Sequence, residues 1–286
     1  MVKRRYDMSV SFSLLTLNCF GTPVPTTRRR LLALARHLEQ STLQLVCLQE
    51  VQLVMYQKLL IEACESYPFQ AYEPYLHSPK GGLVTLSRMP LTTPHFKAYK
   101  EQGRWYLPTV MDIVLRKGML ITSLHWGDTP VVIINTHILA NYNGDWESEG
   151  VFARMQEKQL RQLAETVALQ PSNALVAVVG DFNIPRGSRL YTDFLHWTGL
   201  MDPLAGDLRP THRPPPGVPA HYSLPIDFAF VRVPQTLSLQ ITCEICFSSK
   251  LDLGYRYQEY LSDHNGIELR FTMNSPTLQV TAIDGV

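Results

Sequence analysis

Polar residues stand at the ends of the apolar, strand-like stretches of this chain, and this pattern constrains the fold more than any other feature. The positions are Asn18, Glu50, His137, Asp181 with Asn183, Asp227, and Asp263 with His264. A sandwich that delivers its strands to one rim would bring such distant positions together. Each residue alone is at least as readily a turn former or a packing residue. Only their convergence in space would make them a site.

The opening of the chain alternates strands with helices. Residues 11–17 are apolar and end at a turn, and residues 44–49 form a second such strand with Glu50 at its carboxyl end. Apolar residues at helical spacing follow each strand, at residues 26–38 and 54–64. Strand, helix, strand and helix in this order predict a layered arrangement of helices and sheets.

Short strands punctuated by Gly and Pro dominate the middle of the chain. Strands are predicted at residues 82–87, 109–116, 119–125, 131–135, 174–179, 226–233, 237–247 and 266–273, and helices at residues 149–169 and 189–197. Strands that follow one another predict antiparallel pairing, and two strand-rich halves can supply two packed sheets. We interpret the proline-rich residues 205–225 as a surface loop, because too few strands follow for a second core. The chain is thus expected to form one domain at residues 1–273 with a tail at 274–286.

Composition narrows the function classes. The formal charge is +1, from 26 basic and 25 acidic residues, so no global positive field holds a polyanion non-specifically. Hydrophobic residues make up 45% of the chain, which is enough to bury a core. No run approaches the ~18 apolar residues of a membrane span, and the five cysteines form no repeated framework. These features predict no transmembrane segment and a cytoplasmic location, with peripheral membrane attachment and the oligomeric state left open.

The chemistry that the polar residues suggest is hydrolysis of a phosphate ester. A phosphodiester repels anionic nucleophiles, so a metal ion that neutralises its oxygens and a base that activates water both help. Glu50 and Asn18 offer oxygen ligands, which favour Mg²⁺ or Mn²⁺ over zinc. His264 would be the base, and Asp227 could accept a hydrogen bond from its other nitrogen. The residues left to stabilise the phosphate oxygens or to protonate the leaving group are Asp181, Asn183 and His137.

Six motifs, in order over nearly the whole chain, resemble those of the endonuclease/exonuclease/phosphatase superfamily. They are Leu17-Asn18, Leu48-Gln49-Glu50-Val51, Asn135-Thr136-His137, Gly180-Asp181-Phe182-Asn183, Ile226-Asp227-Phe228 and Ser262-Asp263-His264. DNase I-like nucleases, inositol-polyphosphate 5-phosphatases and neutral sphingomyelinases share this metal-dependent fold. The resemblance implies an α+β protein, a four-layer α/β/β/α sandwich of two packed mixed β-sheets with helices outside, and a catalytic domain at residues 1–273.

The resemblance also implies roles, residue by residue. Glu50 matches the principal Mg²⁺ ligand, with Asn18 assisting and Asp263 as a further ligand. His264 matches the proton acceptor, and Asp227 matches a residue that orients a catalytic histidine. The positions that match phosphate binding or service to the leaving group are Asp181, Asn183 and His137. The expected activity is that of a Mg²⁺-dependent phosphodiesterase, with Mn²⁺ as the alternative ion.

Further motifs are similar to those of neutral sphingomyelinases. They are the runs at residues 17–23 and 117–120, the run at residues 135–143, and Trp197-Thr198-Gly199-Leu200 with Asp202. The run at 135–143 contains two predicted substrate contacts, Tyr142 and Asn143, and the Tyr142 ring could hold a choline group by cation–π contact. A sphingomyelin-like phospholipid is therefore the favoured substrate. Trp105 and Tyr106, with basic residues nearby, would suit a lipid headgroup interface, although an ordinary hairpin explains them as well.

Two other functions stay open. One is a Mg²⁺-dependent endonuclease or exonuclease acting on DNA or RNA, for which Arg28 to Arg30 form the one dense basic run, although a solvated helix face explains that run better than bound DNA does. The other is a non-catalytic scaffold that binds a partner through the same rim. Because every expected catalytic position is occupied, the scaffold is disfavoured.

Overall fold

The computed structural model describes residues 11–92, 94–147, 149–215, 217–254 and 257–273, and the predicted tail at 274–286 lies outside them. The first sheet has the order β10 (Leu239–Cys246), β13 (Gly266–Met273), β1 (Ser11–Asn18), β2 (Leu45–Gln49), β4 (Val84–Ser87) and β3 (Phe69–Ala71). The second has the order β5 (His95–Ala98), β6 (Gly118–Trp126), β7 (Thr129–His137), β8 (Leu175–Asp181) and β9 (Asp227–Arg232). A small hairpin pairs β11 (Leu251–Asp252) with β12 (Gln258–Glu259).

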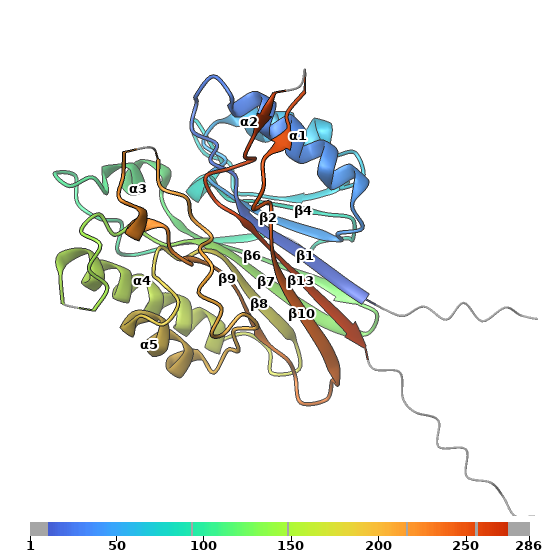
Figure 1. The fold of residues 1–286 in the computed structure, drawn as a ribbon. Helices are drawn as coiled ribbons and strands as arrows, with labels where there is room; N and C mark the ends of the chain where they lie inside the picture. The colour runs from blue at the N-terminus through green and yellow to red at the C-terminus, as the bar shows by residue number, and fades with distance from the viewer. Residues whose placement is uncertain (1–10, 93, 148, 216, 255–256, 274–286) are drawn as a thin grey trace, which may run out of the picture.

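Helices cover the outer face of each sheet, which gives four layers (Figure 1). The helices are α1 (Thr27–Gln40), α2 (Val54–Ala63), α3 (Val110–Leu115), α4 (Val151–Ala168) and α5 (Arg189–Thr198), with short 3₁₀ turns η1 (Lys80–Gly82) and η2 (Ala220–Tyr222). The apolar stripe of α1, including Leu31 and Leu38, packs on Leu15 and Val46 of the first sheet. α4 and α5 bury their apolar faces on the second sheet in the same way. The predicted four-layer sandwich is confirmed.

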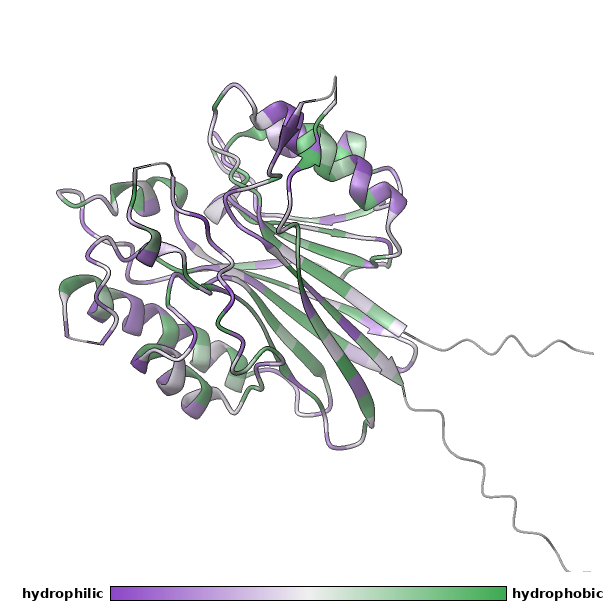
Figure 2. Cartoon of the chain, viewed as in Figure 1, coloured by the Kyte–Doolittle hydropathy of each residue, from purple (hydrophilic) through white to green (hydrophobic). Residues whose placement is uncertain are grey.

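The space between the sheets is filled by the inner residues of both. Phe12 and Leu14 of β1 meet Val131 and Ile133 of β7 and the central residues of β8 in one buried cluster. The apolar, green stretches of Figure 2 run along these central strands. Because strand residues alternate between faces, the residues that follow at even spacing also point into this gap. The alternation that buries Leu175, Ala177 and Val179 thus continues to Asp181, and that of Phe12 and Leu14 to Asn18.

Strand direction brings the polar ends together. β1 and β2 are parallel, as are β7 and β8, so Asn18 pairs with Gln49 and His137 with Asp181 at one end of the sandwich. β9 is antiparallel to β8, so its first residue, Asp227, pairs with Asp181. Both sheets therefore deliver their polar residues to the same rim.

One predicted strand is wrong. Within the predicted strand at residues 109–116, Val110–Leu115 form the helix α3, and Arg116 directly after it has the left-handed conformation. The β-branched residues Val110, Ile113 and Val114 suggested a strand, but their side chains are partly exposed and lie on a single turn of helix. The tertiary environment overrides this local propensity, since the buried Asp112 of α3 pairs with Lys117.

The proline-rich segment passes close to the rim. The backbone of His212 forms an isolated antiparallel bridge with His264. The hydroxyl of Thr211 accepts hydrogen bonds from the backbone N–H groups of Ile226 and Asp227, each at 3.0 Å. This segment therefore supports the start of β9. Across the part of the chain that the structure describes, no helix is long and apolar enough to cross a membrane.

Candidate active site

The polar rim opens into a cleft of about 480 Å³ between the two sheets. Its walls include Glu50 from the end of β2, Lys117 from the start of β6, and side chains from β7, β8 and the segment before β13. The predicted site residues that line it are Glu50, His137, Tyr142, Asp181, Asn183, Asp263 and His264. Two others, Asn18 and Asp227, are buried directly behind these side chains.

His264 and Asp227 form a buried pair. Nδ1 of His264 lies 2.8 Å from Oδ2 of Asp227, so we assign the proton of this hydrogen bond to Nδ1. Nε2 then faces Asn18 and Asp181, at 3.5 Å from the amide nitrogen and 3.8 Å from Oδ2. Burial opposes the charged imidazole, but Asp227 and Asp181 together raise the pKa of His264 to about 10. The pair can hold or pass a proton at Nε2.

Asp181 lies between two histidines. Its Oδ2 accepts a hydrogen bond from the amide of Asn18 at 3.0 Å and lies 3.3 Å from Nε2 of His137. The preceding residue, Gly180, has a φ of 141°, and a Cβ atom there would lie 1.9 Å from the carbonyl oxygen of Thr136. Only glycine permits this close approach of β7 and β8. Burial raises the pKa of Asp181 to about 7, so near neutral pH its carboxyl is a proton donor as well as an acceptor.

His137 is held neutral. Its Nε2 lies 3.0 Å from the ammonium nitrogen of Lys117 and 3.2 Å from the amide nitrogen of Asn183, which are both donors. Burial, and then the charge of Lys117, holds the pKa of His137 well below its usual range. Asn183 also donates to the carbonyl oxygen of Ile138 at 3.0 Å, and its backbone N–H donates to Oδ1 of Asp181 at 2.9 Å. These contacts place two donor groups, the Lys117 ammonium and the Asn183 side-chain amide, on one wall of the cleft.

Sequence reasoning gave no role to two charged residues of this wall. Lys117 and Asp112 are both buried, and Nζ of Lys117 lies 2.6 Å from Oδ1 of Asp112. Nζ also donates to the carbonyl oxygen of Ile138 at 3.0 Å. The sequence did offer one signal for Lys117, which is its position directly before the strand β6. The other site residues also stand at strand ends. The lysine places a fixed positive charge beside His137.

Glu50 is presented by a strained turn. Its φ is 57°, and the backbone N–H of Gly21 donates to its carbonyl oxygen at 2.9 Å. A Cβ atom on Gly21 would lie 2.1 Å from that oxygen, so this turn needs glycine. The amide of Asn18 donates to the Glu50 carboxylate at 3.1 Å. Burial, and then the charge of Asp263, raises the pKa of Glu50.

A buried pair of amides joins the two sheets beneath the cleft. Nε2 of Gln49 donates to Oδ1 of Asn135 at 2.7 Å and to the hydroxyl of Thr16 at 3.0 Å. Asn135 donates in turn to the carbonyl oxygens of Leu48 and Val84, each at 3.2 Å. Gln49 and Asn135 stand within motifs that the sequence singled out, but their role depends on a contact between sheets that no local pattern reports. The pair fixes the separation of the two walls.

The two predicted substrate contacts differ in position. The half-exposed ring of Tyr142 lines the cleft, whereas Asn143 is exposed and is absent from the described residues that line it. Trp146 also lines the cleft, and its indole N–H donates to the carbonyl oxygen of Asn183 at 2.9 Å. This hydrogen bond therefore holds the loop that carries Tyr142 against Asn183, on the same wall of the cleft as His137.

Three curated relatives match parts of this chain, two of them as follows. The inositol phosphosphingolipids phospholipase C of Saccharomyces cerevisiae is 28% identical over 168 residues, which are 57% of this chain and 34% of that protein. A putative neutral sphingomyelinase of Drosophila melanogaster is 25% identical over 202 residues, which are 69% of this chain and 45% of that protein. The chain thus spans less than half the length of either relative.

Solved structures with the same fold cover nearly all of the chain. D. rerio TDP2 complexed with single-strand DNA product has a TM-score of 0.72 at 18% identity, covering 92% of this chain and 99% of that one. A variant of beta toxin from Staphylococcus aureus with bound magnesium ions has a TM-score of 0.69 at 17% identity, covering 92% of this chain and all of that one. The family model described as Endonuclease/Exonuclease/phosphatase family matches residues 15–264. This chain, as the ordered motifs predicted, belongs to that family.

Proposed function

We propose that the chain is a Mg²⁺-dependent phosphodiesterase that hydrolyses a phosphate ester by direct attack of water. The observation that carries the proposal is a pair of adjacent proton-handling groups that line the cleft, with Nε2 of His264 3.8 Å from Oδ2 of Asp181. The His264–Asp227 pair supplies an acceptor, and Asp181, with a pKa of about 7, supplies a donor. One group that accepts a proton and one that donates a proton, both within reach of a phosphate bound in the cleft, suit a displacement at phosphorus.

The carboxylates of Glu50 and Asp263 in the cleft suit Mg²⁺ as ligands. Burial and, after it, the charge of Asp263 raise the pKa of Glu50, so a cation bound beside these two carboxylates would relieve their repulsion. Their carboxylate oxygens are the kind of ligand that Mg²⁺ and Mn²⁺ prefer. Asn18 instead turns its amide nitrogen toward Glu50, and its Oδ1 accepts a hydrogen bond from the backbone N–H of Phe20 at 3.1 Å, so it supports Glu50 rather than offering an oxygen there. When bound, the ion would neutralise the phosphate oxygens and, by repelling the imidazolium, favour the neutral form of His264.

The residues of the chain then divide the reaction. Nε2 of His264 accepts a proton from water as the water oxygen forms its bond to phosphorus. The bond from phosphorus to the leaving oxygen breaks, and Asp181 gives that oxygen a proton. Lys117 and the amide of Asn183 line the cleft beside His137, and we infer that they stabilise the charge of the phosphate oxygens. Neutral His137 holds these two donors in place.

A sphingolipid-type phospholipid is the proposed substrate, as the names of both curated relatives suggest. Trp105 and Tyr106 are 79% and 64% exposed, and three apolar side chains of the adjoining α3 are also exposed. Asp112 and Leu115 of the same helix line the cleft, so this apolar surface borders the site. We infer that it meets a membrane, with the enzyme bound peripherally. All five cysteines are free, which suits the reducing cytoplasm.

A nuclease is the second candidate, favoured by the likeness of the fold to TDP2 complexed with single-strand DNA product. The dense basic run argues against it. A solvated helix face explains only two of its three arginines. Arg30 is buried and donates to the carbonyl oxygens of Cys19, Phe20 and Leu261. Only Arg28 and Arg29 of this run are exposed, and two positive charges are few for binding the phosphates of a nucleic acid.

One parallel assay tests the proposal. Purified protein with Mg²⁺ would be given sphingomyelin vesicles, lysophospholipid, an inositol-phosphate ester and supercoiled DNA, with EDTA and His264→Ala as controls. Headgroup release from lipid that both controls abolish is the expected result. DNA nicking that both controls abolish, without any lipid hydrolysis, would establish the nuclease instead. Mg²⁺ binding without turnover on any substrate would favour the scaffold.

A further inference from the structure

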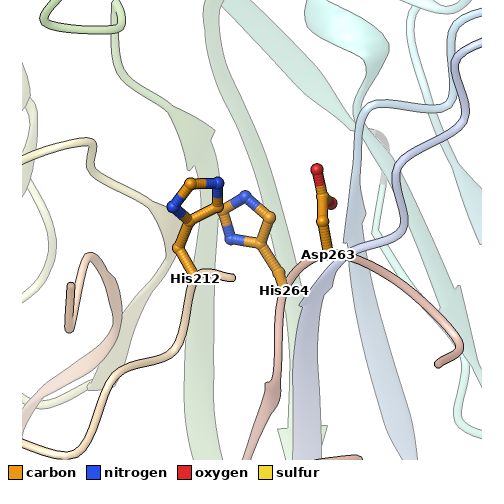
Figure 3. A group of neighbouring side chains, drawn as sticks. All are labelled: His212, Asp263 and His264. Carbon is orange, nitrogen blue, oxygen red and sulfur yellow. The ribbon is translucent and has the colours of Figure 1, made fainter. Parts of the chain in front are cut away.

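Three side chains on one side of the cleft form a second group of metal-binding type. One ligand atom from each of His212, Asp263 and His264 lies within 4.8 Å of those from the other two. The rings of His212 and His264 have centroids 4.9 Å apart, and the backbones of the two residues are bridged. Figure 3 shows the two rings side by side, with the Asp263 carboxylate next to His264.

Both rings already have their other nitrogen engaged. Nδ1 of His212 lies 3.2 Å from the carbonyl oxygen of Tyr222, and Nδ1 of His264 lies 2.8 Å from Oδ2 of Asp227. Each partner oxygen can only accept, so each Nδ1 carries the proton and each Nε2 is left as the metal-binding atom. Histidines that bind zinc characteristically donate their second N–H to a carbonyl or a carboxylate in this way.

The chemistry of the three ligand atoms selects the ion. Two imidazole nitrogens and one carboxylate suit Zn²⁺, whereas Mg²⁺ prefers oxygen ligands alone. Zinc bonds of about 2.0–2.1 Å place ligand atoms about 3.3 Å apart in a tetrahedron, so small side-chain rotations within the 4.8 Å limit complete the site. His212 and Asp263 are only partly buried and line the open cleft, which provides an entry path and room for a fourth ligand.

We propose that His212, Asp263 and His264 form an inhibitory Zn²⁺ site, distinct from the oxygen-ligand set at Glu50. Zinc on Nε2 of His264 takes the lone pair that would accept the proton of water. It also draws Asp263 away from the Mg²⁺ ligands. Zinc binding follows from the three side chains alone, whereas inhibition rests on the phosphodiesterase function proposed above.

Zinc binding is tested first, with the metal alone and no substrate. Isothermal titration calorimetry with Zn²⁺ on the full chain, in buffer with excess Mg²⁺, would compare the parent protein with His212→Gln. The matched control is His221→Gln, which changes an exposed histidine of the same loop. Loss of one of three ligands weakens binding by at least about tenfold in His212→Gln, whereas His221→Gln binds like the parent. Equal Zn²⁺ affinity in the two variants would overturn the site.

Inhibition is tested next on the same three proteins. Each is assayed for Mg²⁺-dependent hydrolysis over a range of Zn²⁺ concentrations and compared with its own zinc-free rate. The concentration for half inhibition rises at least about tenfold in His212→Gln and stays at the parent value in His221→Gln. Unchanged inhibition in His212→Gln, despite weakened binding, would overturn the inhibitory role. A lack of hydrolysis in all three proteins would contradict the phosphodiesterase function, and calorimetry would still decide whether the zinc site exists.

Discussion

Oδ2 of Asp227 lies 2.8 Å from Nδ1 of His264, and this contact determines which nitrogen of the imidazole faces the cleft. The backbone N–H of Asp227 is fixed in turn by the hydroxyl of Thr211. These hydrogen bonds fix the orientation of the His264 ring, so its Nε2 already points toward the reacting groups before substrate binds.

Replacement of Asp227 by asparagine tests this relationship. Asp227→Asn keeps the shape of the side chain but loses the charge that favours the Nδ1–H tautomer and the imidazolium. We expect kcat to fall by roughly 10²- to 10⁴-fold while KM changes little. Asp193→Asn, which removes a partly exposed carboxylate of α5, is the matched control. A rate within a factor of two of the parent would show that Asp227 does not orient the base.

Glu50→Gln separates metal binding from folding. The pKa of Glu50 is raised by burial and by Asp263, so a neutral side chain relieves an unfavourable charge in the metal-free protein. The variant is expected to have a higher Tm than the parent in EDTA. Its half-saturating Mg²⁺ concentration for activity should rise at least about tenfold, because a charged oxygen ligand is lost. A lower Tm in EDTA would show that the charge of Glu50 is not unfavourable in the metal-free protein. An unchanged Mg²⁺ dependence would show that Glu50 is not a metal ligand.

The depressed pKa of His137 makes stability depend on pH. Burial and Lys117 keep the folded imidazole neutral below the usual pKa near 6.5, at which the unfolded chain takes up a proton. This contribution to stability is complete above pH 6.5 and is lost as the pH falls toward the folded pKa, by up to about 1.4 kcal/mol per pH unit. Urea unfolding in EDTA at pH 7, 6 and 5 measures the slope. His137→Gln should reduce it, and an identical slope in parent and variant would contradict the assignment.

The exposed aromatic pair predicts how the enzyme meets its substrate. Trp105→Ser with Tyr106→Ser should weaken sedimentation with phospholipid vesicles by several fold and reduce hydrolysis of vesicle lipid, because apolar area is lost from the surface beside the cleft. Hydrolysis of a soluble phosphodiester should be unaffected. Leu169→Ser is the control, since Leu169 is equally exposed, at 78%, just beyond the end of α4. Equal loss of activity on both substrates would indicate damage to the site instead.

The sequence predicted the convergence of the site because strand alternation is a local property. The apolar positions of β1 and β8 determine which face is buried, and Asn18 and Asp181 continue the same face. The α3 region could not be predicted in this way. Its β-branched residues favour a strand, and the helix is stabilised by the pairing of Asp112 with Lys117 in three dimensions.

Other parts of the site depend on contacts between distant segments. Gln49 and Asn135 join the two sheets, although they are separated by 86 positions in the chain. His212 lies in an irregular proline-rich segment with no periodicity to mark a face. Its nearness to His264 arises only when that segment bridges the residues just before β13. No helical or strand pattern could have reported either contact.

The most direct test of the account is the Mg²⁺-dependent release of phosphorylated headgroup from sphingolipid vesicles by the parent protein and by His264→Ala, at matched concentrations. The account predicts turnover by the parent that EDTA abolishes and that added Mg²⁺ restores. It also predicts a rate at least roughly 10²-fold lower in His264→Ala. Equal rates in the two proteins, or turnover that persists in EDTA, would contradict it.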